Sequence, residues 1–173
     1  MPDLKGLRDR AAIAIMGYTF ARVSAVVGLT LGDYRLEGKR GRLRLMEKGN
    51  KEKLVWLHRE AEEFLDAYIA AAGIEDPKAP LFQTLDKAHI LSGEVLSRRD
   101  MLRAVKLRCN AAGLSESFCN HTFRGTGITV LLNNGGTGSG PGHGESFRSA
   151  HDQALRPARR TREPERDRAQ DCI

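Results

Sequence analysis

The chain has 173 residues, 40% of them hydrophobic, and carries a formal net charge of +6. This length fits one domain of ordinary size. No apolar run approaches the ~20 residues that a membrane-spanning helix requires, and no cleavage site follows the short apolar stretch near the N-terminus, so neither a membrane segment nor a signal peptide is expected. The excess of positive charge favours a polyanionic partner, nucleic acid above all.

The cysteines are odd in number and show neither CxxC spacing nor a nearby cluster of ligands: Cys109, Cys119 and Cys172. Reduced thiols in a cytoplasmic protein are the simplest interpretation of this pattern. No metal site is expected from these residues.

The N-terminal third begins with two helical patterns, over residues 7–17 and 21–28. The apolar face expected for the first is Leu7, Ala11, Ile13 and Ile15. The second ends on Gly28, a residue suited to a helix C-cap.

Polar and apolar residues then alternate over residues 33–58, around turns at Glu37-Gly38 and at Lys48-Gly49-Asn50-Lys51. Alternation with a period of two is typical of half-buried strands, and glycine-containing turns are typical of hairpins. The segment therefore predicts a short antiparallel meander of roughly three strands, with Lys48 at the start of the second turn.

The next segments predict a helix over residues 59–73, a loop over 74–84 and a second helix over 96–113. In the second helix, Ser97 is a plausible N-cap and Asp100 lies three residues on, at the capping-box position. A further helix is predicted from His121 to Asn134. The predicted fold class is α+β, mainly helical.

The composition changes after Thr137. Residues 138–173 contain seven arginines, six acidic residues and no lysine. With few large apolar residues, this segment cannot bury enough surface to offset the entropy of ordering, so disorder is expected. A natural arginine-rich tail that grips nucleic acid is the alternative, which the near-balance of charges weakens.

Four residues stand out as candidates for chemistry: Arg22, Lys48, His121 and Arg124. Guanidinium groups can clasp the oxygens of a phosphodiester and stabilise a pentacovalent phosphorane. A lysine can protonate a leaving 5′ oxygen, and a histidine can move a proton at neutral pH. Taken singly, these residues have plainer interpretations. Arg22 would be a solvated arginine, Lys48 an ordinary turn lysine, and His121 and Arg124 a pair of surface neighbours.

Three segments together, in order and at ordinary spacing, resemble the catalytic domain of the tyrosine recombinases, the phage integrase family. "GYTFARVSAVVGLTLGDY" is similar to that family's first-arginine box, "MEKGNKEKLVWL" to its β-hairpin lysine box and "HTFRGTGITVLLNNGG" to its His-x-x-Arg box. The resemblance covers residues 4–137. It implies a mainly helical domain with a small antiparallel sheet on one edge, which breaks and rejoins double-stranded DNA site-specifically without a metal or nucleotide cofactor.

The resemblance also implies the roles of the candidate residues. Arg22 and Arg124 would hold the scissile phosphate, Lys48 would act as general acid, and His121 would assist proton transfer or phosphate binding. The chain departs from the family at Ala25, where an acidic residue is common, so support for Arg22 is expected from elsewhere. The family's N-terminal DNA-clamping domain is expected to be missing.

The most serious departure is the nucleophile, which in this family is a tyrosine roughly thirty residues after the second arginine. The tyrosines of this chain are Tyr18, Tyr34 and Tyr68, and none follows Arg124. Tyr68 is expected to lie in the core and not to substitute. As written, the chain is therefore expected not to cleave DNA.

A shift of reading frame is our hypothesis for both the tail and the missing tyrosine, and it depends on a choice among the permitted codons. When permitted codons for residues 142–157 are read one base later, they give "His … Thr-Thr-x-Leu-Tyr", as the family's last motif has it. The recovered tyrosine lies thirty-one residues beyond Arg124, and a recovered histidine lies nine residues before it. On this interpretation His143 is not the family's second histidine.

These observations predict a truncated catalytic domain over residues 1–137, incomplete at its C-terminal end, followed by an out-of-frame tail over 138–173. Two alternatives stay open: a DNA-binding remnant without catalysis, and a pseudogene product that folds poorly. Members of the family assemble on DNA, and the sequence leaves assembly of this chain open.

Overall fold

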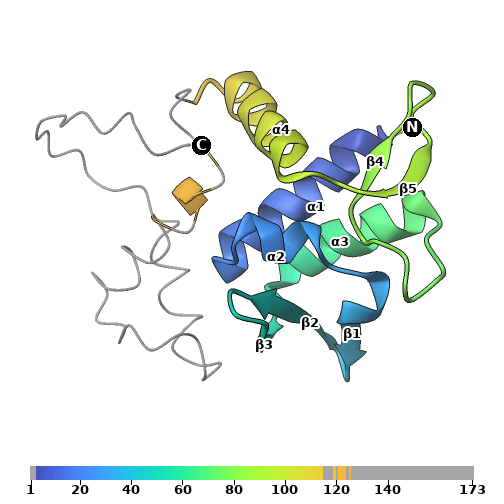
Figure 1. Ribbon diagram of the computed structural model, residues 1–173, viewed down its shortest axis with the longest axis vertical. Helices are drawn as coiled ribbons and strands as arrows, with labels where there is room; N and C mark the ends of the chain where they lie inside the picture. Colours follow the sequence, from blue (N-terminus) through green and yellow to red (C-terminus); the bar gives the residue numbers. More distant parts are fainter. Residues whose placement is uncertain (1–2, 115–118, 120, 124, 126–173) are drawn as a thin grey trace, which may run out of the picture. The chain divides into compact units, whose positions relative to one another are not determined.

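The computed structural model describes residues 3–114, 119, 121–123 and 125. The helices are α1 (Leu4–Thr19), α2 (Val23–Val27), the 3-10 turn η1 (Leu31–Asp33), α3 (Arg59–Ala72) and α4 (Arg98–Ala111). The strands are β1 (Tyr34–Glu37), β2 (Arg40–Glu47), β3 (Lys51–Trp56), β4 (Gln83–Leu85) and β5 (Leu91–Val95). The predicted α+β class, with helices and small antiparallel sheets, is confirmed (Figure 1).

α1 starts where the Asp3 carboxylate accepts a hydrogen bond from the backbone N–H of Lys5, and it ends at Phe20, whose φ of 53° is left-handed. The face predicted for this helix is only partly right, because Leu7 and Ile13 are half-buried. The fully buried apolar side chains are Ala11, Ala12, Ile15 and Met16. Their i, i+1, i+4, i+5 spacing places one wide stripe against the core.

The predicted three-stranded meander is confirmed, in the order β1–β2–β3. Glu37 pairs with Arg40 and Glu47 with Lys51, so both turns are tight. The inward-facing Leu43, Leu45 and Val55 are buried and join the core beneath α3. The other face of the sheet is exposed, as expected for an antiparallel sheet covered on one side.

α3 packs along α1, and in Figure 1 the sheet lies below these two helices while α4 lies above them. Leu65 and Tyr68 of α3 are fully buried, and the Tyr68 ring stacks on Phe82 with the ring centroids 5.7 Å apart. The prediction that Tyr68 belongs to the core is confirmed. α3 ends at Gly73, whose φ of 62° suits glycine.

One local prediction is wrong. The loop predicted over residues 74–84 includes the start of β4, which pairs antiparallel with β5 in a second, two-stranded sheet. This hairpin is mostly exposed, so it lacks the clear alternation that would have indicated it. The prediction that α2 ends on Gly28 is confirmed, since Gly28 is its C-cap residue, with a φ of −82°.

α4 begins as predicted, with the Ser97 hydroxyl accepting a hydrogen bond from the backbone N–H of Asp100. Of the helix predicted from His121 to Asn134, residues 121–123 and 125 are helical, and the rest lies outside the described residues together with the predicted tail. Within the described part, no helix is both long and apolar enough to cross a membrane.

Asp33 links the start of the sheet to the turn before it. The backbone N–H and hydroxyl of Thr30 donate to this carboxylate at 2.9 and 2.8 Å, and Nε of Arg44 donates at 2.8 Å. Burial alone would raise the pKa of the Asp33 carboxyl, but these hydrogen bonds outweigh burial and lower the pKa below its ordinary value of 3.8. The ionised carboxylate therefore stabilises the fold at neutral pH, and this contribution is lost as pH falls through the depressed pKa.

We expect Asp33→Asn to lower the free energy of unfolding by about 1–2 kcal/mol at pH 7, because an amide accepts these hydrogen bonds less well. The difference from the wild type should shrink below pH ~4, where the wild-type carboxyl begins to be protonated. Urea unfolding at neutral and acidic pH measures both values. A difference that is the same at the two pH values would contradict this account.

Candidate functional site

Arg22 is the N-cap residue of α2, directly after the left-handed turn that ends α1. Its backbone is extended, and its side chain makes no capping hydrogen bond. Instead, Nη1 pairs with the Glu47 carboxylate at the end of β2. The Arg22 side chain is 39% exposed, so the guanidinium is held at one edge and open to solvent at another.

Lys48 is the first residue of the β2–β3 turn and is exposed. The turn closes because Gly49 and Asn50 both have positive φ, 81° and 58°. Lys48 follows Glu47 directly, and consecutive Cα atoms lie only ~3.8 Å apart. The Arg22–Glu47 contact therefore holds Arg22 against the end of β2, the strand that leads directly into Lys48, and the meeting of the two cations stays a prediction.

The remaining two candidates lie at the end of the described part. His121 is exposed, in a short helical segment whose Phe123 packs against the core. The hydroxyl of Thr122 accepts a hydrogen bond from the backbone N–H of the buried Cys119, at 3.0 Å. Arg124 lies outside the described residues, so the grouping of His121 and Arg124 with the other two stays a prediction.

Glu47 is the feature of the site that sequence reasoning missed. The absence of an acidic residue at Ala25 indicated that support for Arg22 must come from another segment. Nothing in a strand sequence identifies which carboxylate reaches an arginine 25 residues earlier. The available signal was the period of the meander, which places Glu47 at the last paired position before the turn.

The tyrosines are not prepared for nucleophilic attack. Burial and then a hydrogen bond to Glu60 raise the pKa of Tyr18 to about 12. Burial and a hydrogen bond to Asp66 raise the pKa of Tyr34, and burial raises that of Tyr68. A phenol with a raised pKa is harder to convert to the attacking phenolate.

A separate cluster of charges is built around Asp9, whose side chain is 0% exposed. Nη2 of Arg8 lies 2.9 Å from its carboxylate, Nη2 of Arg108 lies 3.1 Å away and Nζ of Lys5 3.3 Å away. Arg8 also donates to the backbone carbonyl of Gln83 at 2.9 Å. The cluster therefore joins α1 to α4 and to β4.

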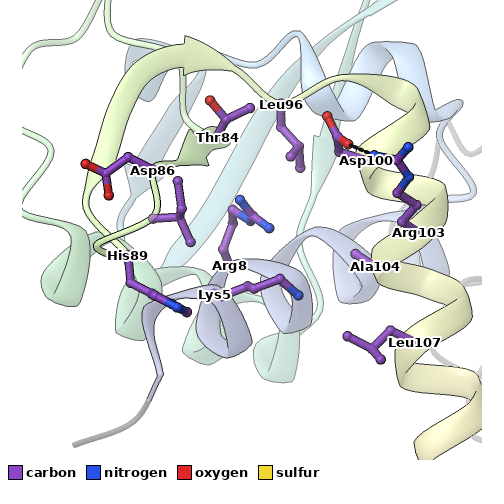
Figure 2. A pocket seen from close by; sticks show the side chains of 11 residues that line it. Lys5, Arg8, Thr84, Asp86, His89, Leu96, Asp100, Arg103, Ala104 and Leu107 are labelled. Atoms are coloured by element: carbon purple, nitrogen blue, oxygen red, sulfur yellow. Dashed lines mark hydrogen bonds and ion pairs between the residues drawn. The ribbon is translucent and has the colours of Figure 1, made fainter.

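Beside this cluster, α1, α4 and the β4–β5 hairpin enclose an open pocket of about 420 Å³ (Figure 2). Charged side chains that line the pocket form ion pairs within the protein. Arg103 pairs with Asp100 at 3.0 Å, as the dashed line in Figure 2 marks. Lys5 and Arg8 pair with Asp9. Of the predicted site residues that the structure describes, Arg22, Lys48 and His121, none lines the pocket.

Comparison with known proteins places these features in a family. The model of the Phage integrase family matches residues 2–137. The tyrosine recombinase XerD of Pseudomonas aeruginosa is 34% identical over 137 residues, which are 77% of this chain and 43% of XerD. The tyrosine recombinase XerC of Pelobacter propionicus is 33% identical over 130 residues, 75% of this chain and 40% of XerC. The chain thus spans less than half the length of these relatives.

Solved structures agree on the fold. The XerH site-specific recombinase bound to its difH substrate, in a pre-cleavage complex, has a TM-score of 0.65 at 20% identity, over 87% of this chain and 43% of XerH. The XerA recombinase has a TM-score of 0.58 at 16% identity, over 92% of this chain and 65% of XerA. The chain belongs to the phage integrase family, and its described part has the fold of a tyrosine recombinase catalytic domain.

Proposed function

We propose that this chain carries the phosphate-binding half of a site-specific DNA recombinase and engages double-stranded DNA through it. The observation that supports this most is the contact of Arg22 with Glu47, the residue directly before Lys48 at the end of β2. A guanidinium can bind two phosphate oxygens at once, and an ammonium at the same place can donate a proton to a leaving oxygen.

In the complete reaction, a tyrosine oxygen would attack the phosphorus while Arg22 and Arg124 hold the non-bridging oxygens. The bond from phosphorus to the 5′ oxygen would break, and Lys48 would give that oxygen its proton. His121 would assist proton transfer or hold the phosphate. We propose these roles from the family's motifs at the matching positions of this sequence.

This chain would perform binding without cleavage. Its three tyrosines precede Arg124 in the sequence, and each has a raised pKa. The chain as written would therefore act as a DNA-binding remnant, which differs from the site-specific recombination of the family only in that no covalent bond to DNA forms. The predicted cytoplasmic location, the frame-shifted tail at 138–173 and the domain boundary at 137 stay predictions.

A nicked duplex tests the proposal, because loss of the short fragment beside the nick traps any covalent intermediate. We expect salt-sensitive binding and no adduct that survives denaturation. A covalent adduct would contradict the inactivity, and the absence of binding would contradict DNA engagement. A cooperative thermal unfolding transition, monitored by circular dichroism, separates a folded protein that does not bind from a chain that folds poorly.

The phosphate contacts proposed for Arg22 and Lys48 predict a specific loss of affinity for duplex DNA. We expect Arg22→Ala and Lys48→Ala each to weaken duplex binding about 3–10-fold and to lower the slope of log affinity against log salt by about one. Arg59→Ala and Lys87→Ala remove the same charges from exposed positions on α3 and in the β4–β5 turn and serve as matched controls. Equal losses in all four variants, measured by fluorescence anisotropy, would indicate a diffuse charge effect and no site.

A further inference from the structure

We propose that Glu47 is a positioning residue for the phosphate site: its carboxylate orients the Arg22 guanidinium and ties Arg22 to the hairpin that carries Lys48. This inference rests on the proposed function, because it states how the chain arranges the groups that would bind the phosphate. It adds a residue that neither the motifs nor the comparisons assign.

The geometry supports an orienting contact more than a surface ion pair. The Glu47 side chain is only 15% exposed, although it lies next to a turn in which every residue is exposed. It meets Arg22 from a different element, 25 residues away in the sequence. A shielded pair of this kind is stronger than an exposed one, because less water screens the two charges.

The contact leaves Arg22 able to bind a phosphate. A guanidinium has five N–H donors, and the Glu47 carboxylate contacts Nη1. The other edge of the group stays available to a ligand, in keeping with its 39% exposure. Fixing the side chain in advance reduces the conformational entropy that binding would otherwise cost.

Position 25 cannot supply this carboxylate. Ala25 lies one turn after Arg22 on α2 and is buried, and its methyl group accepts no hydrogen bond. The support comes instead from the strand that ends at Lys48. As a result, the placement of Arg22 depends on the register of the β2–β3 hairpin, and a disturbance of the hairpin would reach both cations.

The opposing possibility is that Glu47 competes with the phosphate for Arg22 and must leave before DNA binds. A double-mutant cycle separates the two, because any general effect of removing the negative charge cancels in it. The cycle uses the wild type, Arg22→Ala, Glu47→Ala and the double variant, with duplex affinity measured by fluorescence anisotropy.

If Glu47 positions Arg22, Arg22→Ala should cost about 3–10-fold in affinity in the wild type but less than about 2-fold once Glu47 is alanine. Equal costs in the two backgrounds would overturn the proposal. A larger cost without Glu47 would overturn it in favour of competition.

Glu52→Ala is the matched control, because Glu52 lies on β3 in the same β2–β3 pair and contacts Arg44 at 3.8 Å. In that background Arg22→Ala should keep its full cost. Glu47→Gln retains an oxygen that can accept from Nη1, so it should preserve more than half of the fold-change. If circular dichroism shows that Glu47→Ala unfolds, Glu47→Met takes its place in the cycle, because its side chain is of similar length and accepts no such hydrogen bond; equal costs of Arg22→Ala in the wild type and in Glu47→Met overturn the proposal.

The failure of this inference is distinguishable from that of the proposed function. A wild-type chain that does not bind duplex DNA, or whose binding ignores Arg22, overturns both. If binding depends on Arg22, and the cost of Arg22→Ala is the same with and without Glu47, only the positioning role is overturned.

Discussion

Replacing Asp9 with alanine is expected to lower the free energy of unfolding by about 3–5 kcal/mol. The Asp9 carboxylate is fully buried and is contacted by Lys5, Arg8 and Arg108. The Arg8 side chain is itself only 6% exposed. Without Asp9, the Arg8 guanidinium would remain buried next to an apolar methyl group, and an uncompensated buried charge is among the costliest defects a fold can hold.

Urea unfolding followed by circular dichroism measures the loss. Glu63→Ala is the matched control, because Glu63 also pairs with an arginine, Arg59, but both side chains are largely exposed. That pair should contribute between about 0 and 1 kcal/mol. Similar losses for Asp9→Ala and Glu63→Ala would show that the cluster joining α1, α4 and β4 is not what holds these elements together.

Restoring the reading frame is expected to enable the chain to form a covalent bond to DNA. With the permitted codons chosen for residues 142–157, removing one base between the codons of Thr137 and Gly142 would recover a tyrosine thirty-one residues after Arg124. Its oxygen would attack the phosphate held by Arg22, and the 5′ oxygen would leave with a proton from Lys48. Adduct formation on a nicked duplex should rise at least about a thousandfold, since deleting a nucleophile costs on the order of 10⁶ in other covalent enzymes.

The frame-restored chain also provides its own controls. Adding Arg22→Ala should reduce adduct formation by about 10²–10³-fold, the usual cost of losing one donor to a developing charge. Changing the recovered tyrosine to phenylalanine should abolish the adduct and leave duplex binding intact. A restored chain that binds the nicked duplex yet forms no adduct would refute the frame-shift interpretation.

Most of the fold was predictable from sequence because its signals are local. The glycines at the turns and the alternation between them predicted the meander, and Ser97 predicted the start of α4. The β4–β5 hairpin was not predictable in this way. Its loop is shaped by Asp86, whose carboxylate accepts from the backbone N–H groups of Ala88 and Ile90, and by His89 at a φ of 63°. A glycine-free loop of this kind carries no standard hairpin signature.

The candidate site, like the fold, was predictable where its signals are local and not where they depend on tertiary packing. Arg22 and Lys48 could be identified because each sits in a distinctive segment. The partner of Arg22 could not, because Glu47 is an ordinary polar residue of a half-exposed strand and its meeting with Arg22 is a property of tertiary packing. The Asp9 cluster escaped detection for the same reason, since Arg108 lies 99 residues after Asp9. Charged residues in a helix are usually solvated, and only the packed structure shows which are not.

The shortness of the β2–β3 turn has a mechanical consequence. Three residues join the last paired positions, Glu47 and Lys51, and two of them have left-handed backbones that leave the loop little slack. The sheet consequently fixes the backbone of Lys48, and this restricts the volume that its ammonium can reach. A longer, glycine-rich connection would enlarge that volume and dilute the ammonium's effective concentration at a bound phosphodiester, even though no contact had been removed.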